Sequence, residues 1–468
     1  MSILYKFVDY LRNLILEMKL KKFFQLLFLA LLCTSATAQV HEYILDNGLK
    51  LLVKEDHRAP IVVSQVWYKV GSSYETDGTT GVSHVLEHMM FKGTKKLGEG
   101  EFSRIISENG GRENAFTGDD YTAYFQTMEK SRLAISFELE ADRMRNITLP
   151  PDAFKKEVEV VKEERRLRTE DNPNAFLREV AQATAFQTSP YRQPIIGWMA
   201  DLDSMKVEDL RAWYQKYYAP NNATIVVVGD IHPESVYQLA IKYFGKLKAE
   251  EISPPPYRPE VPQLGKKTLI VKRPAEIPRL TLAFKVPGLK SSLQEGSPIE
   301  SWEPYALEVL SGILSGGSSA RFASRLTRGE QVATSVGSSY QMSGRLDGLF
   351  TISGTPTQGR TIEELEIAIR EQLEDIKTSP ASAGELNRVK AQVVSSNVYE
   401  KDSVFYQAMV LGIYETVGLG WKLADEYVQK INGITAEQVQ AVAAKYLLED
   451  TSTLAVLEPV EAKENNGE

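Results

Sequence analysis

The sequence predicts an α+β protein of two homologous domains, each a mixed, mostly antiparallel sheet packed with helices. Three observations support this class: β-branched runs and long helical patterns occur in both halves, a proline-rich stretch divides the chain, and one segment recurs near the end of each half. With 468 residues, of which 43% are hydrophobic and 25% charged, the chain is long enough for two full cores.

The first 38 residues have the pattern of a cleaved secretory signal peptide. Lysines that follow Met18 precede an apolar run ending at Cys33, and Ala36-Thr37-Ala38 is a small-x-small cleavage pattern. The apolar run is too short for a permanent membrane span. We therefore expect an exported protein whose translation starts either at Met1 or at Met18.

The composition excludes several classes of protein. Cys33 is the only cysteine and lies within the signal, so we expect a mature chain without disulfides or a thiol nucleophile. The net charge is −8 at pH 7, and no cluster of basic residues follows the signal. This balance argues against nucleic acids and anionic membrane surfaces as partners.

Prolines in AEEISPPPYRPEVPQLGKK favour an extended linker at residues 249–267. We therefore predict an N-terminal domain at 39–248 and a homologous C-terminal domain at 268–468. MKVEDLRAWYQKYYAPNNATIVVV, at 205–228, aligns without a gap with ITAEQVQAVAAKYLLEDTSTLAVL, at 434–457. The few identities can arise by chance, but their place at the end of each half favours duplication. Each copy is predicted to form an amphipathic helix, a turn and a strand.

Regular elements are also predicted along the first half. Residues 43–70 are expected to form a hairpin with its turn at Asn47-Gly48, followed by a β-rich run. Gly110-Gly111 can turn the chain into a strand over residues 114–117. Helical patterns cover residues 83–91, 101–107, 131–145 and 152–168.

The stretch GVSHVLEHMMF places two histidines four residues apart with a glutamate between them. On a helix, His84 and His88 lie on one face and can bind one metal ion together. Glu87 projects toward the same side, where it can hold a water beside the metal, as in zinc peptidases with the inverted order H-x-x-E-H. The alternative is a solvated helix face. Because the chain has only five histidines, this spacing favours the metal site.

A zinc site needs a third protein ligand, and the helical stretch PDAFKKEVEVVKEERRLR offers four glutamates. Glu157 and Glu164 lie seven residues apart and share a face with two valines between them. Glu159 and Glu163 form a second pair, which is expected to be more exposed. Periodicity alone neither chooses between the pairs nor excludes that all four are solvated.

GVSHVLEHMMFKGT followed by KEVEVVKEERR resembles the pitrilysin family of inverted-motif zinc peptidases, in the short bacterial type that is similar to the mitochondrial processing peptidase beta subunit. The similarity covers essentially the whole mature chain and extends through GGRENAFTGDDYTAYF and PIIGWMADL. The resemblance implies one Zn²⁺ per chain, held by His84, His88 and Glu164. It also implies that Glu157 supports the ligands from behind and that Glu87 is the general base.

The resemblance further implies the activity and its setting. We expect a zinc endopeptidase that cleaves peptides or unfolded segments in a closed chamber, of which this chain forms half of a clam shell. Asn114, Ala115 and Phe116 would lie on an edge strand with which the peptide pairs. A non-catalytic scaffold or chaperone-like member of the fold is the alternative, although it has no need of the intact site residues. The family and the signal indicate the periplasm, with secretion as second choice.

The second half departs from the family's pattern. Self-sufficient members carry an arginine and, seven residues on, a tyrosine that help to bind the substrate carbonyl. In ARFASRLTRGEQVATSV these positions fall on Thr327 and Thr334. Use of Arg325, Arg328 or Tyr340 in their place would need a shift of register. We therefore expect a heterodimer in which this chain bears the zinc and a homologous subunit supplies the arginine and tyrosine.

Overall fold

The computed structural model describes residues 39–253, 255 and 258–461. The predicted signal peptide lies outside these residues. From His41 onward the chain forms one unit, so the two halves can be compared directly. Among the described helices, none combines the length and the apolar character needed to cross a membrane.

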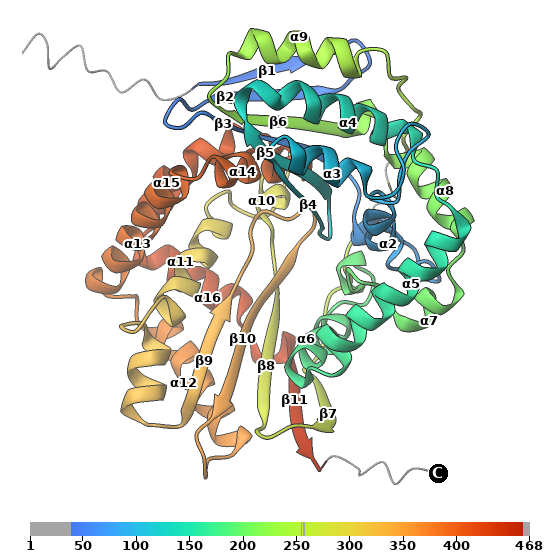
Figure 1. Cartoon of the computed structure of the whole chain (residues 1–468). Coiled ribbons are helices and arrows are strands. Elements are labelled where there is room, and N and C mark those ends of the chain that lie inside the picture. The colour runs from blue at the N-terminus through green and yellow to red at the C-terminus, as the bar shows by residue number, and fades with distance from the viewer. Residues whose placement is uncertain (1–38, 254, 256–257, 462–468) are drawn as a thin grey trace, which may run out of the picture. The chain divides into compact units, whose positions relative to one another are not determined.

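Each half of the chain contains one sheet, and the two sheets share one topology (Figure 1). The strand order is β1-β2-β6-β3-β5-β4 in the first sheet and β7-β11-β8-β10-β9 in the second. The pairs β2–β6 and β7–β11 are parallel, whereas the pairs that continue from β6 to β4 and from β11 to β9 are antiparallel. The second sheet therefore repeats the first apart from β1. The strands are β1 (Val40–Ile44), β2 (Lys50–Glu55), β3 (Ile61–Tyr68), β4 (Arg112–Thr117), β5 (Thr122–Glu129), β6 (Ala223–Gly229), β7 (Lys267–Pro274), β8 (Arg279–Val286), β9 (Ala333–Ser339), β10 (Gly348–Pro356) and β11 (Ser452–Val460).

The helices of the two halves also correspond. The end of the first half, α8 followed by β6, recurs 229 residues later as α16 followed by β11. The structure thus confirms the duplicated helix, turn and strand predicted from the sequence. Among the described residues, the α-helices of eight or more residues are α2 (Val82–Met89), α3 (Glu101–Glu108), α4 (Leu133–Asn146), α5 (Pro151–Arg165), α6 (Pro173–Ala185), α8 (Val207–Tyr217), α9 (Pro233–Phe244), α11 (Glu303–Ser315), α12 (Ile362–Thr378), α13 (Ala383–Lys401), α14 (Val404–Thr416), α15 (Leu423–Gly433) and α16 (Ala436–Tyr446).

Most predicted elements of the first half are confirmed, with one correction. The turn at Asn47-Gly48 joins β1 to β2, and Gly48 adopts the positive φ of +83° that favours glycine. The β-rich run that follows forms β3, but β3 does not extend this hairpin, because β6 lies between β2 and β3. The four predicted helices are α2 to α5. Helix α5 ends at Arg165, and a π-helical turn over Arg166–Glu170 continues it.

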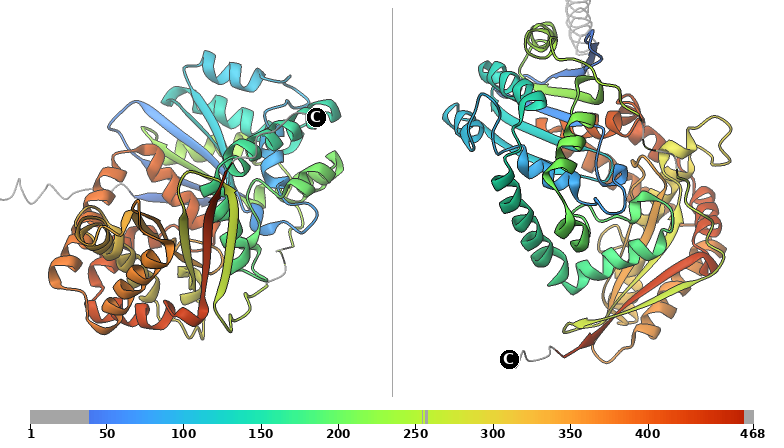
Figure 2. Two further views of the ribbon diagram at one scale, coloured as in Figure 1. Left: turned by 90° about the horizontal axis from the view of Figure 1, so that it is seen from below. Right: turned by 90° about the vertical axis from the view of Figure 1, so that its right-hand side faces the viewer.

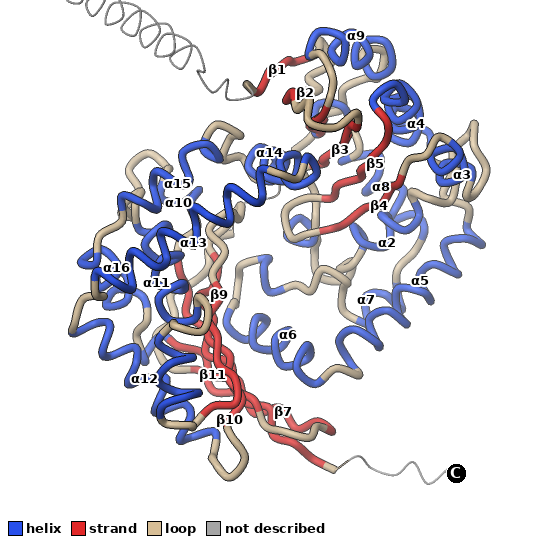
Figure 3. The backbone as a smooth tube through the Cα atoms, turned by 60° about the vertical axis from the view of Figure 1, so that its left-hand side comes forward, coloured by secondary structure: helices blue, strands red, loops and turns tan. Residues whose placement is uncertain are grey.

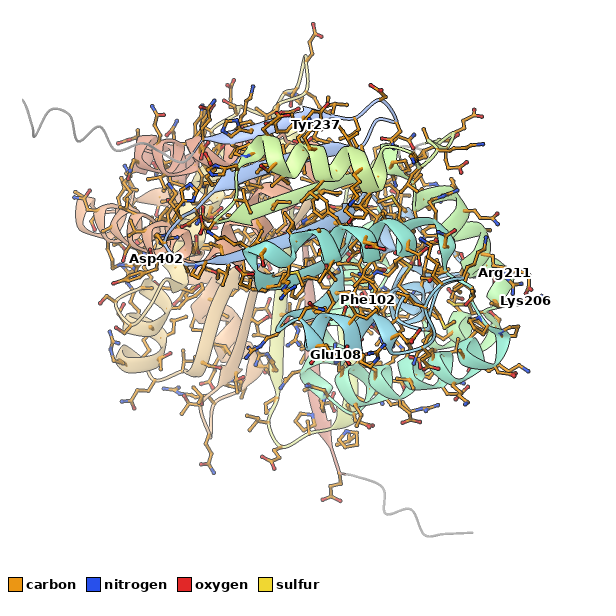
Figure 4. The ribbon with its side chains drawn as sticks, turned by 45° about the horizontal axis from the view of Figure 1, so that its top comes forward. Phe102, Glu108, Lys206, Arg211, Tyr237 and Asp402 are labelled. Atoms are coloured by element: carbon orange, nitrogen blue, oxygen red, sulfur yellow. The ribbon has the colours of Figure 1, made fainter. Side chains whose placement is uncertain are left out.

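Each sheet has a hydrophobic core of its own. In the first half, side chains of β2, β3 and β6, such as Val62, Val66 and Ile225, pack with helices α2, α4, α8 and α9. Phe102 of α3 joins this core (Figure 4). Strand β6, with the sequence ATIVVVG, is buried along its whole length. A strand without polar alternation is typical of a sheet that is covered on both faces.

One face of each sheet is covered by a helix from the other half of the chain. Helix α6 packs on β7, β8 and β11 (Figures 2 and 3). Leu177 of α6 belongs to a buried hydrophobic cluster that includes Leu457 of β11. Reciprocally, α14 packs on β3 and β6. Gly412 of α14 lies so close to Trp67 of β3 that an added Cβ would come within 2.1 Å of the indole. The two halves therefore exchange one helix each.

Polar contacts join the halves as well. Arg58 Nη1 donates to Asp402 Oδ1, at the end of α13, over 2.8 Å (Figure 4). Lys50 Nζ of β2 pairs with Glu415 Oε1 of α14 over 2.6 Å. These contacts lie next to the exchanged helix and reinforce its packing.

The segment between α9 and β7 contains no helix or strand among its described residues. Within it, Glu260 accepts hydrogen bonds from the N–H groups of Gln187, Thr188 and Ser189 over 2.9, 2.9 and 2.8 Å, and it pairs with Lys285. Residues 187–189 follow the exchanged helix α6. One carboxylate thus connects the linker, the end of α6 and the second sheet.

We expect Glu260→Gln to destabilise the protein in a pH-dependent way. Burial raises the pKa of Glu260, but hydrogen bonds from Lys285 and the backbone outweigh it and lower the pKa from 4.5 to about 2. Because the pKa is lower in the folded chain, this contribution is fully present above the unfolded pKa and is lost as the pH falls through the folded pKa. Thermal unfolding at pH 7 should show a loss of about 1–3 kcal/mol. The difference in the free energy of unfolding between wild type and variant should become smaller below about pH 4.5. The exposed control Glu276→Gln should not show this loss of stability. A difference that is independent of pH, or an equal loss in the control, would contradict this account.

Candidate metal and active site

Helix α2 carries the H-x-x-E-H motif, and close contacts fix its first turn. Gly81 precedes the helix at φ +87°, and an added Cβ would come within 2.7 Å of the Ile196 carbonyl. The carboxyl group of Glu75 accepts hydrogen bonds from the N–H groups of Gly81 and Ser83 over 2.7 and 2.8 Å, which satisfies donors that a helix start leaves open. The direction in which the polar face of α2 points is therefore fixed.

The side chains of His84, His88 and Glu164 converge between α2 and α5. Glu164 Oε2 lies 3.8 Å from His84 Nε2 and 3.5 Å from His88 Nε2. One ligand atom from each residue lies within 4.8 Å of the others. Two imidazole nitrogens and one carboxylate oxygen form a donor set that fits zinc and leaves a coordination position for water or substrate.

The surroundings of His84 favour its neutral form. Burial lowers the pKa of His84 to about 3, and the charges of His88 and Arg168 act in the same direction. Neutral imidazole is the form that binds a metal ion. His84 Nδ1 is buried without a hydrogen-bond partner in the part of the chain that the structure describes, so Nε2 is the nitrogen turned toward the carboxylate.

The structure distinguishes the two pairs of glutamates on α5. The side chains of Glu157 and Glu164 are 13% and 17% exposed, whereas those of Glu159 and Glu163 are 64% and 63% exposed. Glu157 Oε2 lies 3.2 Å from His88 Nδ1, on the side of the ring away from Glu164. A carboxylate in this place orients the imidazole for a metal. The less exposed pair is the pair that the resemblance indicated.

Glu87 lies on α2 beside the histidines, and the end of β4 holds its carboxyl group. Thr117 Oγ1 donates to Glu87 Oε2 over 2.5 Å. Burial raises the pKa of Glu87, and the hydrogen bond from Thr117 partly opposes this shift. A carboxyl group with a raised pKa is suited to accept a proton and to return it.

A cavity of about 730 Å³ opens in front of these residues. Asn114, Ala115 and Phe116 line it from β4, the edge strand of the first sheet (Figure 1). One side of β4 pairs with β5, and the other has no strand partner among the described residues. An extended peptide can therefore add to this edge through main-chain hydrogen bonds. Further lining residues are Arg168, Thr169, Glu179, Gln182 and those at 192–196.

Two contacts of the site were missed in the sequence. Arg168 Nη1 pairs with Glu164 Oε1 over 2.6 Å, which leaves Oε2 for the histidines. The spacing of four residues on a predicted helix could have revealed this pair. The bond from Thr117 to Glu87 links a strand to a helix and has no such spacing. Both Arg168 and Thr117 line the cavity.

Among its described residues, the second half contributes none to the lining of this cavity, all of which lies at or before Ile196. Thr327 and Thr334 are both outside it. None of the three alternative residues, Arg325, Arg328 and Tyr340, lines the cavity. Two of them are engaged elsewhere: Arg325 pairs with Asp375 over 2.6 Å, and the Tyr340 hydroxyl donates to a backbone carbonyl over 2.6 Å. The described chain thus brings neither an arginine nor a tyrosine from its second half to this cavity.

Comparisons with known proteins agree with this fold. A model described as Insulinase (Peptidase family M16) matches residues 50–198, and one described as Peptidase M16 inactive domain matches residues 204–393. Zinc protease PqqE of Helicobacter pylori is 33% identical, over 90% of this chain and 93% of its own. A probable mitochondrial-processing peptidase subunit beta of Arabidopsis thaliana is 23% identical, over 89% of this chain and 78% of its own. The crystal structure of a protease from Helicobacter pylori matches with a TM-score of 0.84 and 29% identity, over 90% of this chain and 100% of that one.

The chain combines a two-domain α+β fold with a His-His-Glu group beside an edge strand. These features are those of a metallopeptidase, the class that the names of these relatives also indicate. The chain belongs to peptidase family M16, as the resemblance of its motifs indicated. The match named after the insulinases covers His84, Glu87, His88 and Glu164, whereas none of the residues that line the cavity falls in the match named for an inactive domain.

Proposed function

We propose that this protein is a zinc endopeptidase that hydrolyses peptides or unfolded polypeptide segments. The observation that carries the proposal is the convergence of His84, His88 and Glu164 around Glu87, beside the free edge of β4. A scaffold or chaperone-like role is the alternative. It gives no reason for two histidines and the partly buried Glu164 to converge at one cavity.

The site has the donors for one Zn²⁺ per chain. His84, His88 and Glu164 would hold the ion, and Glu157 would fix the ring of His88. When bound, zinc supplies Lewis-acid polarisation of the scissile carbonyl and of the attacking water. The carboxylate of Glu164 keeps its second oxygen on Arg168, so it would offer the metal a single oxygen.

The proton transfers are assigned to Glu87. A peptide added to β4 passes over the polar face of α2, where Glu87 takes a proton from the attacking water and later delivers it to the leaving amine. Because Glu87 Oε2 accepts the hydrogen bond from Thr117, Glu87 Oε1 is the oxygen that exchanges this proton. Glu87 is therefore the catalytic acid and base of the proposed reaction.

We further infer that a homologous subunit completes the site. Threonines stand at 327 and 334, where self-sufficient members of the family have arginine and tyrosine, and every described residue that lines the cavity belongs to the first half. A partner that brings both residues would close the chamber and bind the substrate carbonyl. One relative is itself named as a subunit. The pattern of residues 1–38 supports export to the periplasm.

The experiment is hydrolysis of a quenched-fluorescent unstructured peptide by the zinc-loaded chain of residues 39–468, alone and with a homologous subunit that lacks H-x-x-E-H. We expect activity to rise by about 10²–10³-fold with the partner, the size of effect known for groups that stabilise the reacting carbonyl. A partner whose arginine and tyrosine are replaced serves as the control and should not restore activity. Full activity of the chain alone would contradict the heterodimer.

A further inference from the structure

One loop of the second half reaches the turn between β4 and β5. This loop, residues 340–347, connects β9 to β10 and carries Arg345. The backbone N–H of Arg345 donates to Asp120 Oδ2 over 2.8 Å, and its Nε donates to Oδ1 over 3.3 Å. Its Nη2 donates to the carbonyl and hydroxyl oxygens of Ser73 over 3.0 and 2.9 Å, and its guanidinium lies 4.4 Å from the ring centre of Tyr74.

Asp120 and Ser73 are buried, and Arg345 itself is partly buried. The side chains of Arg345 and Asp120 are 15% and 4% exposed. Ser73 Oγ donates to Asp120 Oδ1 over 2.7 Å, the Tyr191 hydroxyl donates to Oδ2 over 2.5 Å, and Leu346 N donates to the Tyr191 oxygen over 3.1 Å. A buried ion pair is stable only when its remaining donors and acceptors are satisfied, and then it fixes one geometry. The β4–β5 turn is therefore held in one position by three separate segments.

The position of this turn determines two parts of the candidate site. Asp119 of the turn and Thr117, which ends β4, line the cavity. Thr117 also holds the carboxyl group of Glu87. Among the described strands, β4 has a partner on one side only, so its position is not fixed by a second strand. The anchored turn at the end of β4 fixes this position instead.

We propose that Arg345 is a positioning residue for the active site of its own chain: it holds the β4–β5 turn, and through the turn it places the substrate-pairing edge of β4 and the carboxyl group of Glu87. Its effect on catalysis rests on the proposed peptidase function, whereas its effect on β4 does not. The second half thus acts on the cavity without lining it.

The test compares Arg345→Lys with the wild type as full zinc-loaded chains. Lysine keeps the positive charge, but it lacks the planar guanidinium group whose several N–H donors bind Asp120 and Ser73 at the same time. We expect amide hydrogen exchange of residues 112–121 to accelerate by about tenfold or more, with a zinc Kd within about twofold. With the completing subunit, kcat/KM for a long peptide should fall by about 10–100-fold, largely through KM, as expected for a misplaced binding strand.

Lys50→Gln is the matched control, because it removes another ion pair between the halves, the one with Glu415. It should lower Tm without a change in exchange at 112–121. Ser73→Ala is a milder second variant that removes one acceptor of Arg345, and it should accelerate exchange in the same segment. Unchanged exchange at 112–121 in both variants would overturn the proposal, as would accelerated exchange with unaltered kcat/KM. Absence of peptidase activity in the wild type with its partner would instead reject the proposed function, while the exchange results still decide the role of Arg345.

Discussion

Glu87→Gln is expected to lower kcat for peptide hydrolysis by about 10²–10⁴-fold, the range of general acid–base catalysis. The amide has nearly the shape of the carboxyl group, and its oxygen can still accept the hydrogen bond from Thr117. It can neither take a proton from water nor deliver one to the leaving amine. The measurement is steady-state hydrolysis of a quenched-fluorescent peptide in the presence of the completing subunit.

The control for this variant removes one negative charge from an exposed position on α5. Glu163 is 63% exposed and pairs with Arg166, so Glu163→Gln should keep kcat within about twofold of the wild type. Zinc content measured on both variants separates loss of the base from loss of the metal. A Glu87→Gln enzyme that keeps more than about a tenth of the wild-type kcat would show that another group transfers the proton.

The sequence was sufficient where the relevant spacing is local. His84 and His88 lie one turn apart, and a helix of any orientation keeps them on one face. The repeat at the ends of the two halves was found because the helix and the turn have equal lengths in both copies, so that the two strands begin at the same offset. The turn at Asn47-Gly48 follows from the backbone conformation that glycine permits.

Non-local pairing accounts for what the sequence did not reveal. The insertion of β6 between β2 and β3 and the exchange of α6 with α14 each depend on which apolar surface meets which, and periodicity gives burial without naming the partner. The choice of Glu164 over Glu163 depends on the rotation of α5 against α2. Arg345 and Asp120 are 225 residues apart and carry no pattern that joins them.

The ligand assignment predicts a graded series among the glutamates of α5. Glu164→Gln is expected to weaken zinc binding by more than about 100-fold, because the neutral amide oxygen is a poor ligand and only two imidazoles remain. Glu157→Gln should weaken zinc binding by about 10–100-fold. The variant keeps all three ligands, but it loses the carboxylate that orients the ring of His88. Competition of the purified chain against a zinc-chelating dye gives both affinities.

Glu159→Gln provides the lower end of this series, because the Glu159 side chain is 64% exposed and pairs with Lys162 rather than with a histidine. Its zinc Kd should stay within about twofold of the wild type. Peptidase activity should follow the same order, and dialysis against a chelator should abolish it until zinc is restored. An equal loss in Glu159→Gln and Glu164→Gln would mean that overall negative charge, and not the rotation of α5 that turns Glu164 toward His84 and His88, holds the ion.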